Sequence, residues 1–156
     1  MYQKLKDSEV THPVKTGNNV KTVTLNFHIL EKGNYSIITT QYKGSTYNIL
    51  LDTGAGKSVF NKNYLDFFEK SYTGSDALIT GATGEKVKAE YYWIEVPICD
   101  EAPFTISLVS DREVIFKHLK DEYNLDVCMV LGNSFLKETS AVIDYMAKTI
   151  TFNIPI

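Results

Sequence analysis

The sequence predicts a mainly β fold, and three features of the chain support this. Apolar and polar residues alternate over residues 22–29, which is the period of a half-buried strand. Gly-containing turns separate further β-rich segments, and helical spacing is confined to short stretches. With 156 residues, of which 44% are apolar, the chain can bury one good core. We therefore expect a single domain over residues 20–156.

The segment before this domain, residues 1–19, is polar and contains Pro13 and Gly17, a composition typical of a flexible lead-in. His28 falls on the polar face of the strand that follows. No carboxylate or serine stands at a useful spacing from it. We expect His28 to be solvated rather than catalytic.

A hairpin is predicted next, because residues 35–42 and 46–51 are both β-rich and only a short Gly-containing link joins them. Its second strand ends in the apolar run Ile49-Leu50-Leu51, and Asp52 follows directly. A carboxylate at the end of a buried strand is suited to proton transfer. The alternative is an ordinary turn in which Asp52 only accepts backbone hydrogen bonds.

Gly54 and Gly56 follow Asp52, and we expect them to give this turn backbone angles that a β-carbon forbids. Beyond the turn, residues 58–60 are extended, and Asn61 can cap a short helix that reaches Lys70. The apolar side chains of that helix are predicted to be core: Tyr64, Leu65, Phe67 and Phe68.

Three more strands follow, and the first two form a hairpin. Residues 77–80 lead into a tip that Gly81 and Gly84 bracket, and the chain returns through residues 87–98. A further strand covers residues 104–109. The aromatic residues of the returning strand fit either a sheet core or a pocket wall: Tyr91, Tyr92 and Trp93.

Residues 111–126 are predicted to form an amphipathic helix, since Ile115, Phe116, Leu119 and Tyr123 fall near helical spacing among charged residues. We expect this helix to cover one end of the fold or to shape a substrate-binding rim. Its charged residues fit a solvated face.

Asp52-Thr53-Gly54-Ala55, preceded by an apolar strand, resembles the active-site loop of the aspartic proteases. Val127-Cys128-Met129-Val130-Leu131-Gly132 is similar to that family's second apolar strand, which packs beneath the loop and precedes a short helix. Residues 141–145 and 149–152 resemble the closing hairpin of bacterial members. Because the chain holds a single Asp-Thr-Gly, it resembles the retropepsin-like (retroviral-type) branch, whose members build one site from two chains. The resemblance covers residues 35–152.

This resemblance implies a closed β-barrel, equivalent to one pepsin-like half, with short helices after the catalytic loop, in the 111–126 insert and after Gly132. It implies a homodimeric aspartic endopeptidase that acts on peptide or protein substrates, with Asp52 of each chain as the catalytic acid. Further roles implied by the resemblance are the active-site loop at Thr53, Gly54 and Ala55, a flap over the substrate at Ile79, Thr80, Gly81, Ala82, Thr83 and Gly84, and support of the loop by Leu131, Gly132 and Asn133.

Two positions depart from the retroviral pattern. Gly56 stands where a polar residue is common, and Asn133 stands where an arginine braces the loop and the dimer. These departures leave open a second hypothesis, a catalytically silent protease-like domain that serves as a peptide-binding or dimerisation module. A processing domain within a larger polyprotein is a third hypothesis.

The bulk properties argue against several classes of partner. A net charge of -3 and a pI near 5.6, without a basic cluster, disfavour nucleic acid. No stretch approaches the ~20 apolar residues that span a bilayer. Cys99 and Cys128 are expected to stay unbridged. They also lack metal-ligand spacing, so we expect no bound metal. The proposed acid chemistry needs no cofactor. We expect a cytoplasmic protein if Met1 is native, and one of the cell envelope or periplasm if an export signal was trimmed.

Overall fold

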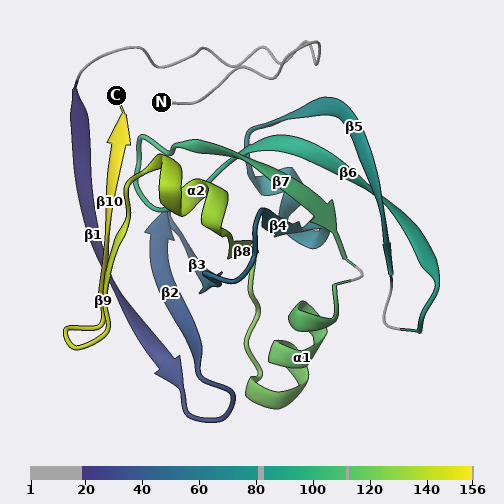
Figure 1. Ribbon diagram of the computed structural model, residues 1–156, viewed down its shortest axis with the longest axis horizontal. Helices are drawn as coiled ribbons and strands as arrows, with labels where there is room; N and C mark the ends of the chain where they lie inside the picture. The colour runs from purple at the N-terminus through teal and green to yellow at the C-terminus, as the bar shows by residue number, and fades with distance from the viewer. Residues whose placement is uncertain (1–18, 81–82, 112, 156) are drawn as a thin grey trace.

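Ten β-strands form one sheet in the computed structural model, which describes residues 19–80, 83–111 and 113–155 (Figure 1). The prediction of a mainly β fold is confirmed. Across the sheet the strands follow the order β5-β6-β7-β4-β8-β3-β2-β1-β10-β9. Their bounds are β1 Val20–Leu30, β2 Tyr35–Tyr42, β3 Ser45–Leu51, β4 Ser58–Asn61, β5 Lys70–Thr80, β6 Lys86–Glu95, β7 Phe104–Ser110, β8 Met129–Leu131, β9 Val142–Asp144 and β10 Thr149–Pro155. The helical segments of the described chain are the 3-10 helix η1 (Lys62–Phe67) and the α-helices α1 (Val114–Tyr123) and α2 (Asn133–Glu138).

The two edges of this sheet do not meet, so the predicted closed barrel is not confirmed. Within the described chain, β5 pairs with β6 alone and β9 pairs with β10 alone. The edge strands lie at opposite sides of the molecule in Figure 1, with β5 in a hairpin that reaches away from the body. The other edge strand, β9, has only three residues available for pairing with another strand. Neither edge is therefore placed to complete a barrel.

The hairpin that leads to Asp52 forms as predicted. Its strands β2 and β3 are antiparallel, and Tyr42 lies opposite Ser45. Lys43 and Gly44 occupy the turn with φ of 48° and 82°. Positive φ at both central residues is what a two-residue type I′ turn requires, and glycine adopts it without strain.

Strand β3 lies in the middle of the sheet and is buried on both faces at its end. It pairs antiparallel with β2 and parallel with β8. Ile49 and Leu51 pack into the main core, whereas Leu50 packs into a second cluster on the opposite face. A strand covered on both faces has a continuous apolar run instead of an alternating one, which explains the sequence before Asp52.

The predicted amphipathic helix forms as α1, which is shorter than the expected 111–126 span, and it covers the second face of the sheet. Phe116 and Leu119 are buried in the same cluster as Leu50 and Val130. The helix ends at Asn124, which adopts the left-handed conformation common after a helix C-terminus. Its charged residues lie outward as predicted, and Lys117 pairs with Asp121 one turn later.

The helix predicted to run from Asn61 to Lys70 is shorter than expected. Asn61 caps it as predicted, its side-chain oxygen accepting a hydrogen bond from the Asn63 amide (3.1 Å), but η1 ends at Phe67. Phe68 is buried, whereas Phe67 is 66% exposed, so its assignment to the core is wrong. Phe68 follows the end of η1 with extended backbone angles (φ −127°, ψ 149°) and enters the main core, whereas Phe67 is the last residue of the helix and stays exposed.

The remaining expectations from the sequence are mostly met. Strand β6 ends at Glu95 rather than at residue 98, and Trp93 on it is core. The strand, the short helix and the closing hairpin predicted after residue 126 form as β8, α2, β9 and β10. His28 is exposed, and no disulfide joins Cys99 to Cys128, which is buried. The lead-in over residues 1–19 lies almost wholly outside the described residues.

Candidate active site

Asp52 stands at the point where β3 leaves the sheet. Its backbone amide donates to the carbonyl oxygen of Leu131 on β8 (3.1 Å), which continues the pairing of the two strands by one residue. Its Oδ1 accepts a hydrogen bond from the Gly54 amide (2.9 Å), and the Ala55 amide closes the turn onto the Asp52 carbonyl (3.2 Å). The side chain itself is exposed. A carboxylate on a rigid strand is thus held in one orientation and left open to ligands.

The beginning of α2 fixes the far side of this loop. The Asn133 amide donates to the Ala55 carbonyl (2.7 Å), and the Ser134 amide donates to the Gly56 carbonyl (3.0 Å). All three residues predicted to support the loop, Leu131, Gly132 and Asn133, lie against it.

Gly132 lies so close to the loop that a side chain does not fit. A β-carbon at this position would lie 2.5 Å from the carbonyl carbon and oxygen of Lys57 and 2.9 Å from the Ser58 amide. The Gly132 amide donates to the Ser58 hydroxyl (3.0 Å), and Ser58 is fully buried. The close approach of two backbones explains the glycine.

The role expected of Gly54 and Gly56 is wrong, since neither residue has a positive φ. The turn closes with angles that other residues can adopt. A β-carbon on Gly54 would lie 3.3 Å from Asp52 Oδ1, whereas one on Gly56 would meet nothing within 4 Å. Gly54 therefore allows its amide to approach the Asp52 carboxylate closely. The open space around Gly56 offers no structural explanation for that glycine.

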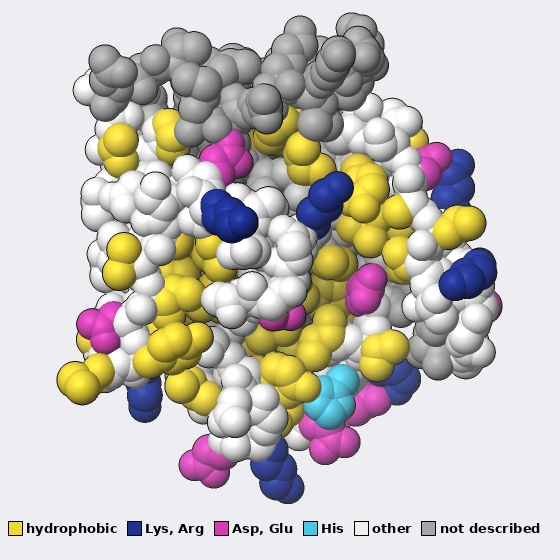
Figure 2. Space-filling view, viewed as in Figure 1, with side chains coloured by type: hydrophobic (Ala, Val, Ile, Leu, Met, Phe, Trp, Pro, Cys, Tyr) yellow, Lys and Arg dark blue, Asp and Glu magenta, His cyan; other side chains and the backbone are white. Residues whose placement is uncertain are grey.

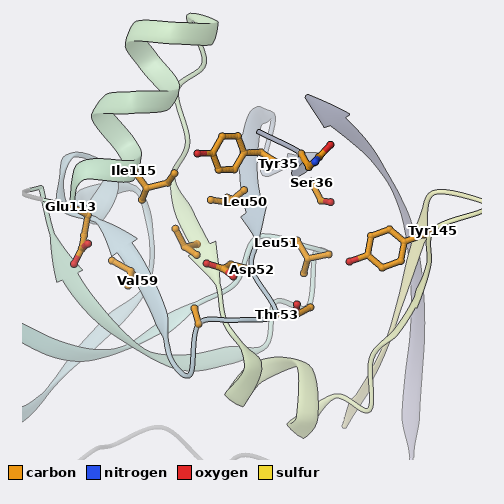
Figure 3. Close-up of a pocket in the computed structure, with 13 residues that line it drawn as sticks. Tyr35, Ser36, Leu50, Leu51, Asp52, Thr53, Val59, Glu113, Ile115 and Tyr145 are labelled. Atoms are coloured by element: carbon orange, nitrogen blue, oxygen red, sulfur yellow. The ribbon is translucent and has the colours of Figure 1, made fainter. Parts of the chain in front are cut away.

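A cavity of about 460 Å³ opens beside Asp52 (Figure 3). Its size lies within the range of about 300–1,000 Å³ typical of small-ligand sites. Strands, loops and α1 all contribute to its wall, which consists of Asn34, Tyr35, Ser36, Leu50, Leu51, Asp52, Thr53, Ala55, Val59, Glu113, Ile115, Val130 and Tyr145. The predicted loop residues Thr53 and Ala55 are brought to the same cavity as Asp52.

Hydrophobic side chains dominate the middle of the face seen in Figure 2, and most charged side chains lie toward its edge. The described charged residues of the cavity wall are Asp52 and Glu113, both acidic. In Figure 3 these two residues lie on either side of Val59, and the Tyr145 hydroxyl points toward Leu51 and Asp52. An apolar wall with a few polar groups is the usual composition of a binding pocket.

The predicted flap residues belong to the β5–β6 hairpin. Ile79 pairs with Val87 and Thr80 pairs with Lys86, while Gly84 has a φ of 85° in the tip. Gly81 and Ala82 lie outside the described residues. Ile79, Thr80, Thr83 and Gly84 do not line the cavity beside Asp52. The described residues of the hairpin tip therefore lie outside the wall of this cavity.

Three cavity residues carried no signal in the sequence. Tyr35 begins β2, Glu113 precedes α1 and Tyr145 belongs to the turn before β10, so only the tertiary fold brings them together. Glu113 and Ile115 lie in the 111–126 insert, for which a role in the substrate-binding rim is one of the two expectations, but that expectation singles out neither residue. Among the described residues, no group of three or more His, Cys, Asp or Glu is placed to hold a metal ion. The helices of the described chain are each too short or too polar to cross a membrane.

No protein-family model matches this chain, and no curated protein matches it. Among solved structures, the chain is similar to a crystal structure of a retropepsin-like aspartic protease from Rickettsia conorii. The two share 17% sequence identity, with a TM-score of 0.47 over 91% of this chain and 98% of the other. At this identity, function has to be judged from the chain's own residues.

Proposed function

We propose that this protein is an aspartic endopeptidase whose active site forms when two copies each contribute Asp52. The placement of Asp52 carries this proposal: an exposed carboxylate at the end of a doubly buried strand, oriented by the Gly54 amide, beside a cavity of about 460 Å³. If Asp52 only stabilised a turn by accepting backbone hydrogen bonds, it would need neither an exposed side chain nor a cavity beside it.

The rigidity of the loop supports a catalytic role. Backbone hydrogen bonds from Asp52 to β8, and from Asn133 and Ser134 to the loop, fix its position on both sides. Catalytic groups act best when elements of regular structure hold them in one geometry. The exposed side chain lets the carboxylate reach both a water molecule and the carbonyl group of a peptide.

Two facing carboxylates cannot both ionise easily, so such a pair holds one proton between them. In the proposed reaction the ionised Asp52 of one copy takes a proton from a bound water. The water oxygen attacks the peptide carbonyl carbon while the protonated Asp52 of the partner donates its proton to the carbonyl oxygen. Proton transfer to the amide nitrogen then lets the peptide bond break.

The other predicted residues take supporting roles in this proposal. The Thr53 hydroxyl is proposed to reach the opposite loop, and the β5–β6 hairpin is proposed to close over the substrate when one binds. Its arrangement in Figure 1, away from the body, is then the open state. The silent binding module uses the same cavity without proton transfer, so the test has to separate binding from cleavage.

Replacement of Asp52 by Asn tests the proposal, because an amide keeps the shape of the acid but cannot exchange its proton. Wild-type protein should cleave members of a diverse peptide library, and a pepstatin-like inhibitor should block it. Asp52→Asn should keep its circular dichroism spectrum and lose cleavage. Asp66→Asn, which removes an exposed acid on η1, is the matched control and should cleave normally. Cleavage that survives in Asp52→Asn would exclude Asp52 from the reaction.

A further inference from the structure

Glu113 presents an unused carboxylate to the cavity beside Asp52. It is the residue before α1, with extended backbone angles (φ −68°, ψ 126°), and its side chain makes no capping hydrogen bond to the helix. The side chain is half-buried and lines the cavity. Within the described parts of the chain, we find no hydrogen bond or ion pair of this carboxylate. A ligand can therefore take it as a partner.

The wall around Glu113 is apolar. Ile115 follows it on α1, Val59 comes from β4, and Leu50 and Val130 come from the paired strands β3 and β8. Such a surface favours the methylene groups of a long side chain. Lysine and arginine combine a methylene stem with a cationic tip, and they bury the stem while the tip finds a polar partner.

Charge selects among the long side chains that fit this space. Because Asp52 and Glu113 are the charged residues in the described wall, an acidic side chain would meet like charge. A neutral apolar chain would displace water from the Glu113 carboxylate and offer no hydrogen bond in return, which carries a cost. A cationic tip meets neither penalty.

We infer that the cavity beside Asp52 is a specificity pocket for a basic residue of the substrate, and that Glu113 is the residue that selects it. The inference rests on the proposed function for the nature of the ligand, a peptide held with its scissile bond at Asp52. Arginine should be preferred over lysine, because its planar guanidinium can donate two parallel hydrogen bonds to one carboxylate.

The test uses four peptides of one sequence that differ only at a residue flanking the scissile bond: Arg, Lys, norleucine or Glu. For the wild type, kcat/KM should be about tenfold higher for the Arg peptide than for the norleucine peptide, the size expected of charge-assisted hydrogen bonds in a partly exposed pocket. Glu113→Gln should lower this ratio to near one, because cleavage of the Arg peptide should fall more than cleavage of the norleucine peptide. Glu113→Lys should reverse the order and favour the Glu peptide.

Glu122→Gln is the matched control, since Glu122 is an exposed acid of the same helix outside the cavity wall. It should keep the wild-type preference for arginine. Equal loss of cleavage of all four peptides in Glu113→Gln would assign Glu113 to the reaction or to the fold. A wild-type preference for the norleucine or Glu peptide would overturn the inference directly.

A binding experiment separates this inference from the proposed function. Fluorescein-labelled Arg and norleucine peptides are titrated with Asp52→Asn protein, and fluorescence anisotropy gives Kd. Tighter binding of the Arg peptide, lost in Asp52→Asn with Glu113→Gln, supports the basic pocket even if the wild type cleaves nothing. Cleavage without any preference, together with equal binding of both peptides, rejects the pocket and leaves the protease in place.

Discussion

Two acids of this chain, Asp52 and Glu95, differ in what surrounds them. Glu95 is 3% exposed, and both of its carboxylate oxygens are occupied: the Tyr42 hydroxyl donates to one (2.7 Å) and the Glu69 amide to the other (3.0 Å). Burial, followed by the hydrogen bond to Glu95, raises the pKa of Tyr42, so this pair stays intact at high pH. Glu95 therefore joins two parts of the sheet, whereas Asp52 accepts a side-chain hydrogen bond at Oδ1 alone within the described chain.

Among the described glycines, Gly132 is the one at which an added β-carbon would meet the backbone most closely. We expect Gly132→Ala to destabilise the fold by about 1–3 kcal/mol, the range for forced overpacking, because the new methyl group would displace the backbone at Lys57 and Ser58. The active-site loop should move with that backbone, so cleavage should fall as well. Urea unfolding measures the first effect and a peptide assay the second.

Gly56→Ala provides the control for this substitution in the same loop. A β-carbon at Gly56 meets nothing within 4 Å, and its backbone angles suit alanine. Its stability should stay within about 0.5 kcal/mol of the wild type, the range for changes that break no contact. Equal stability of both variants would show that the loop yields to Gly132→Ala without cost.

Cys128 should make the protein less stable at alkaline pH. Burial raises the pKa of its thiol from 9.0 to about 12. Because the pKa in the folded state is the higher one, the thiol supports folding below pH 9, and this contribution is lost as pH rises from 9 toward 12. Each pH unit in that window should lower the free energy of unfolding by about 1 kcal/mol. Urea unfolding of wild type and Cys128→Ala from pH 8 to 11 checks this, since the variant should lack that part of the slope.

At the scale of elements, the sequence predicts those strands, turns and helices whose formation depends on neighbouring residues. The alternation in β1, the hairpin turn at Lys43 and Gly44 and the helical spacing of α1 all follow from neighbouring residues. The position of the loop at Asp52 also belongs to this class, because an acid directly follows an apolar run, whereas the backbone angles expected of Gly54 and Gly56 are not observed. These elements form where the pattern places them.

The cavity does not follow from local pattern, because its wall is assembled across the sheet. Tyr35 and Glu113 are far apart in sequence and meet only because β2, β3 and β8 pair side by side and α1 packs across them. Closure of the sheet is also a long-range property, since it depends on the length and direction of β5 and β9. Phe67 and Phe68 show the same effect at small scale, because the residue at which η1 ends decides which of the two aromatic side chains enters the core.

At the scale of the whole molecule, each chain brings one acid of the proposed pair. The loop ends an inner strand of the sheet, and the cavity beside it contains one further described carboxylate, which the specificity inference assigns to the substrate. In the proposed mechanism, the second Asp52 therefore comes from a second copy of the chain. A two-fold axis beside the loops would bring the two Asp52 residues together, because a symmetric dimer places equivalent surfaces opposite each other.

Mixing of wild-type protein with Asp52→Asn tests this shared site more directly than molecular mass does. If each site needs Asp52 from both copies, a mixed dimer is inactive. After exchange of subunits at equal concentrations, a fixed amount of wild type should retain about half of its activity, because half of its chains then sit in mixed dimers. Addition of the same amount of Asp66→Asn should cause no loss.

Sedimentation velocity over a concentration series, with and without a pepstatin-like inhibitor, shows whether the subunits associate and can exchange. Full activity in a mixture whose subunits exchange would mean that one chain carries the whole site, and the second acid would then have to be sought within it, first at Glu113.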